Sequence, residues 1–216
     1  MNGRVNPRLY LVIGPDDCEH DPVAIATAAV TGGVSLVQLR AKDLSGRAFL
    51  QLALRMKQAL AGSGVPLLIN DRVDIALAAQ VDGVHLGQDD LPARQARQIL
   101  GPEAIIGLTI RSRSEAEQAP LEVLDYLSIG GVFATRSKDN PDPPIGLSGL
   151  TTLATLLRAH STLPLCAIAG INGDNAASVL AAGVEGVAVI SAITAASDPT
   201  QAARDLRRLI DAHLRT

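Results

Sequence analysis

Short apolar runs alternate along the chain with longer segments in which apolar residues recur at helical spacing. The runs are rich in Val, Ile and Leu, a composition that favours β-strands. They predict eight strands, at residues 9–13, 34–39, 67–69, 84–86, 104–109, 124–129, 163–169 and 186–190. A segment with helical character follows each run, so the pattern predicts strand and helix units in regular succession.

The segments between the strands carry start and stop signals of helices. Pro22 follows Asp21 and Pro199 follows Asp198, so each of these two helices is expected to begin with a side-chain cap and a proline in its first turn. Other helices are expected at residues 45–60, 73–79, 92–100 and 147–160, from Ser112 or Ser114, and from a cap at Asn172 to Gly183.

Eight strand and helix units predict an α/β fold with a parallel sheet, and eight is the number of strands that closes a TIM barrel. A length of 216 residues suits one barrel, and no linker, repeat or low-complexity tract divides the chain. We therefore expect a single-domain (β/α)8 TIM barrel over residues 1–216. An open doubly wound sheet is the alternative, but Gly14-Pro15-Asp16 after the first strand lacks the glycine-rich dinucleotide fingerprint.

Composition narrows the classes of partner. Apolar residues make up 47% of the chain and the formal net charge is -3, which indicates a large core and no basic face for nucleic acid. No segment approaches the length of a membrane span, and the apolar run at 9–13 is too short for a signal peptide. Cys18 and Cys166 fit neither a redox pair nor a zinc pattern, so reduced thiols in the cytoplasm are expected. Assembly as a homo-oligomer is left open.

Acidic residues follow the third and fourth predicted strands, at the end of a barrel where active sites are built. Asn70 and Asp71 follow one strand, and Asp90 follows the next. Because parallel neighbours end at the same edge, the two carboxylates are expected to converge on one point. Such hard oxygen ligands suit Mg²⁺ together with a phosphorylated ligand. Either aspartate alone would be more typical of a helix start, so the prediction depends on the pair.

Basic residues follow other strands. Arg40 and Lys42 alternate with apolar neighbours, so both are expected to face the barrel mouth. The loop from Phe133 to Gly146 is long for a barrel connection and carries Lys138, and we interpret it as a lid over phosphates.

A phosphate site is expected where the last two strands end, at Gly170 and the Ile190-Ser191 turn. Other polar residues are assigned structural roles. Asp74 and Asp89 are interpreted as solvent-facing or capping residues, and His85, inside an apolar strand, as a hydrogen-bonded core histidine.

With these motifs in view, the chain resembles the thiamine phosphate synthase family over nearly its whole length. The resemblance is carried by Leu9-Tyr10-Leu11-Val12, Val37-Gln38-Leu39-Arg40-Ala41-Lys42, Ile69-Asn70-Asp71-Arg72-Val73-Asp74, Gly83-Val84-His85-Leu86-Gly87-Gln88-Asp89-Asp90-Leu91-Pro92, Val132-Phe133-Ala134-Thr135-Arg136-Ser137-Lys138 and Val187-Ala188-Val189-Ile190-Ser191. It implies a barrel enzyme that joins hydroxymethylpyrimidine diphosphate to a thiazole phosphate, with or without a carboxyl group, and that needs Mg²⁺.

Roles follow from the resemblance position by position. It implies that the pyrimidine diphosphate is held by Gln38, Arg40, Lys42, Asn70, Thr109 and Lys138, of which Arg40, Lys42 and Lys138 also assist catalysis. It implies that Asp71 and Asp90 bind Mg²⁺. The thiazole phosphate is expected to be held by Thr135, Ser137, Gly170, Ile190 and Ser191.

The chain departs from the family pattern at a few positions. The family usually has serine followed by Thr-His where this chain has Thr109-Ile110-Arg111, and Gly-Pro-Val-Phe-Pro-Thr where residues 130–135 read Gly-Gly-Val-Phe-Ala-Thr. Ser137 replaces a common threonine, and Ala169 replaces the first of two glycines. Thr109 and Ser137 keep their hydroxyl groups, so their binding roles are expected to be kept, and Arg111 makes the strand-five region the largest departure.

The implied reaction displaces pyrophosphate from the pyrimidine methylene by the thiazole nitrogen. An electron-rich aminopyrimidine supports positive charge on that carbon, so a dissociative path is expected, and an uncharged ring nitrogen needs no strong base. A thiazole tautomerase of similar fold is one alternative, although it relies on a histidine where Arg111 stands. A non-catalytic barrel that binds thiamine precursors is the other.

Overall fold

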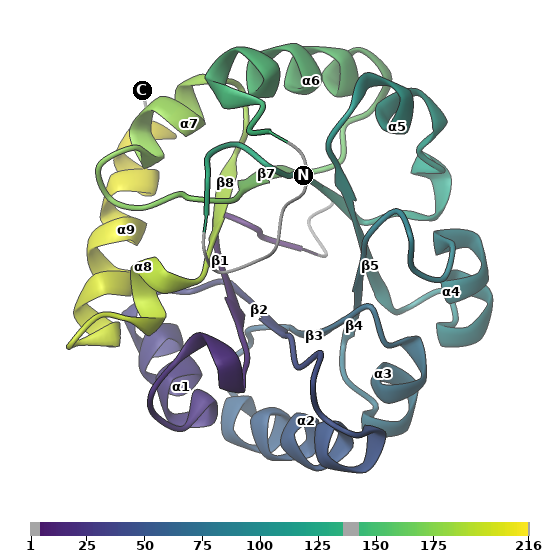
Figure 1. Ribbon diagram of the computed structural model, residues 1–216, viewed down its shortest axis with the longest axis vertical. Coiled ribbons are helices and arrows are strands. Elements are labelled where there is room, and N and C mark those ends of the chain that lie inside the picture. The colour runs from purple at the N-terminus through teal and green to yellow at the C-terminus, as the bar shows by residue number, and fades with distance from the viewer. Residues whose placement is uncertain (1–4, 136–142, 216) are drawn as a thin grey trace.

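Eight parallel strands form a closed barrel in chain order, and a ring of helices surrounds it (Figure 1). The computed structural model describes residues 5–135 and 143–215. Its strands are β1 (Leu9–Ile13), β2 (Leu36–Leu39), β3 (Leu67–Asn70), β4 (Gly83–Leu86), β5 (Ile105–Ile110), β6 (Tyr126–Ile129), β7 (Leu165–Ile168) and β8 (Gly186–Val189). The predicted TIM barrel is confirmed, and the doubly wound alternative is wrong because β1 pairs with β8 and leaves no sheet edge.

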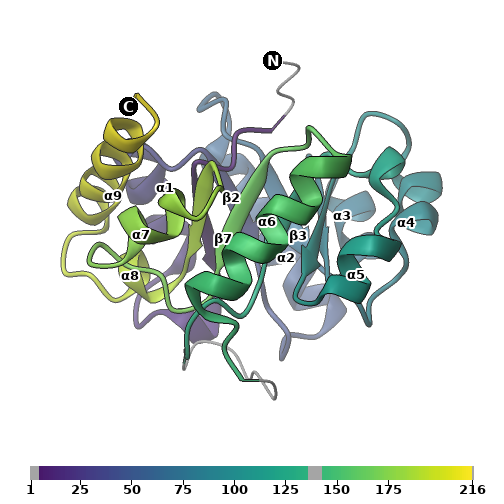
Figure 2. The same cartoon turned by 90° about the horizontal axis from the view of Figure 1, so that it is seen from above.

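Helices connect each strand to the next along the outside of the barrel (Figure 2). The α-helices are α1 (Pro22–Gly32), α2 (Gly46–Leu60), α3 (Val73–Ala79), α4 (Ala93–Leu100), α5 (Arg113–Gln118), α6 (Gly146–His160), α7 (Ala176–Ala181), α8 (Ser191–Thr194) and α9 (Pro199–His213), and the 3-10 helices are η1 (Pro15–Asp17) and η2 (Leu121–Val123). Among the helices described, none is both long and apolar enough to cross a membrane.

The expected helix caps are present at three helix starts. Asp21 accepts a hydrogen bond from the backbone N–H of Val23, and Asp198 accepts one from that of Gln201, each with proline in the first turn. Ser112, rather than Ser114, caps α5 by accepting from the N–H of Glu115. These side chains satisfy N–H groups that have no partner within the helix.

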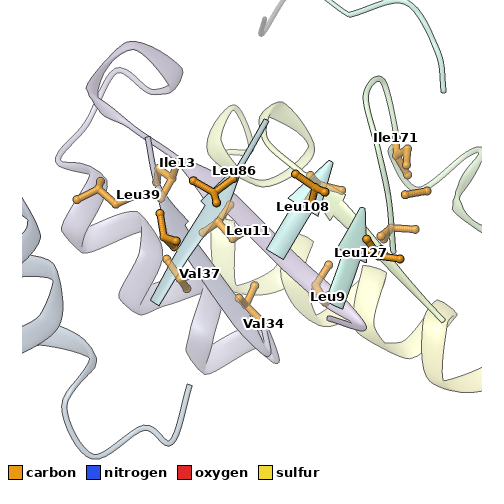
Figure 3. Close-up of a cluster of buried hydrophobic side chains, with 14 of the residues drawn as sticks. Leu9, Leu11, Ile13, Val34, Val37, Leu39, Leu86, Leu108, Leu127 and Ile171 are labelled. Carbon is orange, nitrogen blue, oxygen red and sulfur yellow. The ribbon is translucent and has the colours of Figure 1, made fainter. Parts of the chain in front are cut away.

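Strand alternation divides the apolar residues into two layers. The larger layer contains helix residues together with strand residues such as Leu9, Leu11 and Ile13, and so lies between sheet and helices (Figure 3). The smaller layer contains Tyr10, Val12 and further strand residues but no helix residue. It therefore fills the barrel interior, as expected of a closed barrel of this size.

Several strands are shorter than predicted, for local reasons. The second begins at Leu36 because the N–H of Val34 donates to the carbonyl of Ala29 and helps to end α1. The sixth begins at Tyr126 because η2 occupies the residues before it. The seventh ends at Ile168, since Ala169 has φ of 97° and leaves the extended conformation.

The predicted cap of the seventh helix is wrong. Asn172 accepts a hydrogen bond from the N–H of Asp174 and so forms a turn before the helix. The helix α7 begins at Ala176, after Asn175. An asparagine side chain that accepts from the N–H two residues later is typical of a turn. The sequence pattern did not distinguish such a turn from a helix cap.

Candidate active site

A cavity opens at the carboxyl ends of the strands. Its volume is about 840 Å³ including the open mouth, and residues from all eight strands or the loops after them contribute to its wall. It is lined by Tyr10, Val12, Gln38, Arg40, Asn70, His85, Thr109, Arg111, Ser128, Gly130, Gly131, Thr135, Ile168, Ala169, Gly170, Ile171, Ala188, Val189, Ile190 and Ser191.

Most of the predicted site residues that the structure describes meet at this cavity. Its wall includes Gln38, Arg40, Asn70, Thr109, Thr135, Gly170, Ile190 and Ser191. Lys42, Asp71 and Asp90 are not part of the wall, but Asp71 directly follows Asn70, which is. Arg136, Ser137 and Lys138 lie outside the described residues, and so does half of the predicted lid.

The two aspartates lie against each other, as the strand pattern predicts. Burial and the neighbouring Asp90 carboxylate raise the pKa of Asp71 to about 6, while Lys42 acts in the opposite direction. Lys42 Nζ lies 3.4 Å from Asp71 Oδ2, and the Asp71 side chain is 21% exposed. A partly buried carboxyl group beside a second carboxylate forms a place where bound positive charge is favourable.

Local backbone geometry directs both carboxylates to this point. Asp71 has φ of 63°, in the left-handed region, and its N–H donates to the carbonyl of His85 on β4 at 2.9 Å. Asp90 Oδ2 accepts a 2.6 Å hydrogen bond from the backbone N–H of Gly87. Each aspartate is thus anchored in the loop after its own strand.

The donor set fits a magnesium ion that also binds substrate phosphates. The described residues contain no group of three or more His, Cys, Asp or Glu side chains placed to hold a metal. A pair of carboxylates is nevertheless sufficient for Mg²⁺, which commonly keeps several waters and takes its other ligands from phosphate oxygens. Asp71 and Asp90 are the residues that would hold it here.

The opposite side of the cavity has small residues and tight turns. Gly170 has φ of 67°, and a Cβ there would lie 2.6 Å from the carbonyl oxygen of Ala134. Its own carbonyl accepts a 2.9 Å hydrogen bond from Asn175 Nδ2. Ile190 and Ser191 line the same region at the start of α8. The residues predicted to hold the thiazole phosphate are therefore brought together, as far as the structure describes them.

Several of the departures from the family pattern lie at this cavity. Arg111 is part of its wall, and a Cβ on Gly131 would lie 3.2 Å from an Arg111 guanidinium nitrogen. The glycine at position 131 therefore leaves room for the arginine. Ala169 carries a side chain at φ of 97°, a conformation that favours glycine.

Some residues at the cavity were not predicted to belong to it. Tyr10 and Ser128 line the wall although they lie within apolar strands. His85 is buried, as expected, but it also lines the wall. The chain has two tyrosines and no tryptophan, so a tyrosine inside an apolar strand is unusual in this sequence. That position was the signal from which a cavity residue could have been predicted. Asp74 and Asp89 are exposed, which agrees with the structural roles assigned to them.

Comparison with known proteins gives one consistent result. A family model described as thiamine monophosphate synthase matches residues 9–193. The chain is similar to the thiamine-phosphate synthase of Agrobacterium fabrum, with 50% identity over 214 residues that cover 98% of this chain and 97% of that protein. It is also similar to that of Albidiferax ferrireducens, with 47% identity and coverage of 95% and 92%.

A solved structure agrees with the sequence relatives. The thiamine phosphate pyrophosphorylase from Pyrococcus furiosus superposes with a TM-score of 0.84 at 35% identity, and the match covers 96% of this chain and 97% of that chain. Fold and sequence thus point to the same group of proteins, over the full barrel rather than one part of it.

Proposed function

Since the chain belongs to the thiamine-phosphate synthase family of transferases, we propose that it joins hydroxymethylpyrimidine diphosphate to a thiazole phosphate. The new bond links the thiazole ring nitrogen to the pyrimidine methylene carbon, and the bond from that carbon to the diphosphate oxygen breaks. Thiamine phosphate and pyrophosphate are the products. The step belongs to thiamine biosynthesis.

The observation that carries this proposal is the placement of the acidic pair beside a cationic group. Asp71 and Asp90 lie together after β3 and β4, and Lys42 lies 3.4 Å from Asp71 after β2. Arg40, on the same strand end, lines the cavity. This arrangement suits a diphosphate bound jointly by a metal ion and by side-chain cations.

Catalysis in this family is metal-dependent in general, and we propose Mg²⁺ as the metal. Bound at Asp71 and Asp90, it would supply electrostatic stabilisation of charge on the departing diphosphate oxygens. The side chains of Arg40 and Lys42, with Lys138 by the sequence prediction, orient the diphosphate and neutralise the same charge.

A dissociative path follows from this distribution of charge. The groups proposed here stabilise the leaving group, and positive charge on the methylene carbon is supported by the aminopyrimidine ring. Gln38, Asn70 and Thr109 line the cavity beside these cations and hold the pyrimidine diphosphate in our proposal. The nucleophile is an uncharged ring nitrogen, so no side chain needs to remove a proton before it attacks.

The thiazole phosphate is assigned to the other side of the cavity. Thr135, Gly170, Ile190 and Ser191 line that side, and Ser137 is included by the sequence prediction. Neither the tautomerase nor the non-catalytic alternative is favoured by an observation, since the sequence relatives compared above are named as thiamine-phosphate synthases and the solved structure as a thiamine phosphate pyrophosphorylase. A homo-oligomeric assembly and a cytoplasmic location stay predictions. The free thiols of Cys18 and Cys166 support the second.

The direct test incubates the purified protein with both substrates and Mg²⁺ and measures pyrophosphate release. We expect release only when both substrates and the metal are present, and its loss on addition of EDTA. The variant Asp90→Asn should raise the Mg²⁺ concentration needed for half-maximal rate, whereas Asp89→Asn, at the exposed neighbouring position, is the matched control. Pyrophosphate release that persists in EDTA, or equal Mg²⁺ dependence in the two variants, would contradict the metal assignment.

A further inference from the structure

Five polar side chains from five strands form a continuous chain of hydrogen bonds across the floor of the cavity. We call this set, Gln38, Tyr10, Tyr126, His85 and Thr109, the floor relay. Gln38 Nε2 donates to Tyr10 Oη. Tyr10 Oη and Tyr126 Oη are 2.8 Å apart, Tyr126 Oη and His85 Nδ1 are 2.7 Å apart, and His85 Nε2 and Thr109 Oγ1 are 2.7 Å apart.

The floor relay lies in the barrel interior, where most of the other side chains are aliphatic. Tyr10 and Tyr126 are 1% and 0% exposed, and Gln38 and His85 are 3% and 6% exposed. Buried polar groups are costly unless all of them are hydrogen-bonded, and a fully bonded set is rigid. Gly107 makes room for it, because a Cβ there would lie 2.1 Å from the Tyr126 ring.

The amide donor at one end favours one direction for the hydrogen bonds that follow. An amide nitrogen can only donate, so Tyr10 Oη accepts from Gln38 and its own hydrogen is directed to Tyr126. Since Tyr126 Oη then accepts from Tyr10, the hydrogen of Tyr126 is left for Nδ1 of His85, which lies 2.7 Å away. Burial raises the pKa of both tyrosines above the ordinary value, which keeps the two hydroxyl hydrogens in place.

The same reasoning fixes the histidine and the threonine. An imidazole whose Nδ1 accepts a hydrogen bond carries its proton on Nε2 when neutral, so Nε2 of His85 donates to Thr109 Oγ1. The hydroxyl hydrogen of Thr109 is then directed away from His85. Thr109 lines the cavity, and its backbone carbonyl accepts a hydrogen bond from the Gln88 side chain.

We propose that the floor relay holds the Thr109 hydroxyl as a hydrogen-bond donor aimed into the cavity, with Tyr10, Tyr126 and His85 as positioning residues. Its partner is an acceptor atom of the bound pyrimidine diphosphate, so this part of the inference rests on the proposed function. A ligand that presents an N–H or O–H group at this point is disfavoured, because the hydroxyl is already oriented as a donor.

The first test measures the histidine tautomer in the protein without substrate. The chain has four histidines, so the ¹⁵N NMR signals of His85 can be assigned by comparison with a His85→Gln variant. We expect a neutral ring with the proton on Nε2, and loss of this single-tautomer signature in Tyr126→Phe. A proton on Nδ1, or no change in Tyr126→Phe, would overturn the proposed direction.

The second test asks whether Tyr126 acts through Thr109. We expect Tyr126→Phe and Thr109→Val each to lower kcat/KM for the pyrimidine diphosphate about tenfold, the size of one hydrogen bond to a ligand, with KM for the thiazole phosphate unchanged. The double variant should be no slower than Thr109→Val alone. Multiplied losses in the double variant would overturn the coupling.

The matched control for lost packing is Cys166→Ala. Cys166 is fully buried in the same interior layer and its Sγ donates to the carbonyl of Leu127, outside the floor relay. This variant should lower stability without moving the His85 tautomer. Because the NMR measurement needs no substrate, it decides the relay direction even when pyrophosphate release fails and the proposed function is rejected.

Discussion

Asp71 joins an unusual backbone to an unusual carboxyl group. Its φ of 63° is tolerated by aspartate and asparagine better than by most side chains, and it turns the carboxylate toward Asp90. The ordinary pKa of 3.8 rises to about 6, so the folded protein binds a proton at Asp71 more tightly than the unfolded chain does. Ionisation of Asp71 therefore opposes folding when no metal is bound.

The consequence is a loss of stability with rising pH. As pH increases from about 4 to about 6, the free energy of unfolding of the metal-free protein should fall relative to that of Asp71→Asn, and the difference should become constant above this window. Urea denaturation in EDTA at a series of pH values measures it. Asp74→Asn is the control, because the Arg72 guanidinium lowers the pKa of Asp74 and places its titration below the window. Parallel pH profiles for wild type and Asp71→Asn would contradict the prediction.

Ala169 is a second residue whose backbone conflicts with its side chain. Its φ of 97° lies in the left-handed half of conformational space, where a Cβ costs about 1–2 kcal/mol. Ala169→Gly should therefore stabilise the protein by about 1 kcal/mol after allowance for the greater flexibility of the unfolded chain. Thermal denaturation tests this, with Ala78→Gly in α3 as the control that should destabilise by a similar amount. A lower melting temperature for both variants would show that position 169 is not strained.

The limits of sequence-based prediction are clear at the residue level. Asp71 and Asp90 could be predicted to meet because each follows an apolar run and parallel strands end together. The floor relay could not, because Tyr10 and Tyr126 are 116 residues apart and meet only across the closed barrel. Nothing local to either tyrosine distinguishes a hydrogen-bonded hydroxyl in the barrel interior from an ordinary aromatic core residue.

At the level of the elements, the apolar periodicity located every strand, and the errors lie at strand and helix ends. Val34 and Leu124 are apolar and buried, as strand residues would be, yet their backbone N–H groups donate to carbonyls of the preceding helices α1 and η2. Burial and strand pairing are separate properties, and periodicity reports only burial. The strand ends that face the cavity were predicted more accurately, because polar residues mark them.

Arg97 connects α4 to the residues that precede β5 and β6. Arg97 donates to the carbonyls of Gly101, Ala104 and Val123 and forms a 2.7 Å ion pair with Asp125. The two side chains are 18% and 12% exposed, so the pair is largely shielded from water. The same Asp125 carboxylate accepts from the N–H of Ile106 at the start of β5.

Loss of this arginine should leave a shielded carboxylate and several carbonyls without their donor. We expect Arg97→Met to lower the free energy of unfolding by about 3 kcal/mol, measured by urea denaturation. Arg94→Met, on the same helix, removes an exposed ion pair with Glu122 and should cost less than about 1 kcal/mol. Equal effects of the two substitutions would show that the buried bonds of Arg97 contribute nothing beyond a surface pair.

On the scale of the whole molecule, the proposed diphosphate site depends on the packing of several strand and helix units. Arg40 and Lys42 follow β2, Asp71 follows β3 and Asp90 follows β4, so no single strand and helix unit contains the site. A ligand bound there contacts the native barrel and not the unfolded chain, and it must stabilise the fold by mass action. Pyrophosphate, the proposed product, is the simplest such ligand.

Pyrophosphate with Mg²⁺ should therefore raise the melting temperature. At about one hundred times the dissociation constant the stabilisation is about 2.7 kcal/mol, which corresponds to about 5–10 °C for a domain of this size. Neither pyrophosphate in EDTA nor Mg²⁺ alone should reproduce the shift, because the two acidic side chains repel the diphosphate until a cation lies between them. Asp90→Asn should reduce the shift obtained with both, while Asp89→Asn should keep it. An equal shift with and without Mg²⁺ would mean that Arg40 and Lys42 bind the diphosphate without help from the acidic pair, and the metal would then have to act elsewhere.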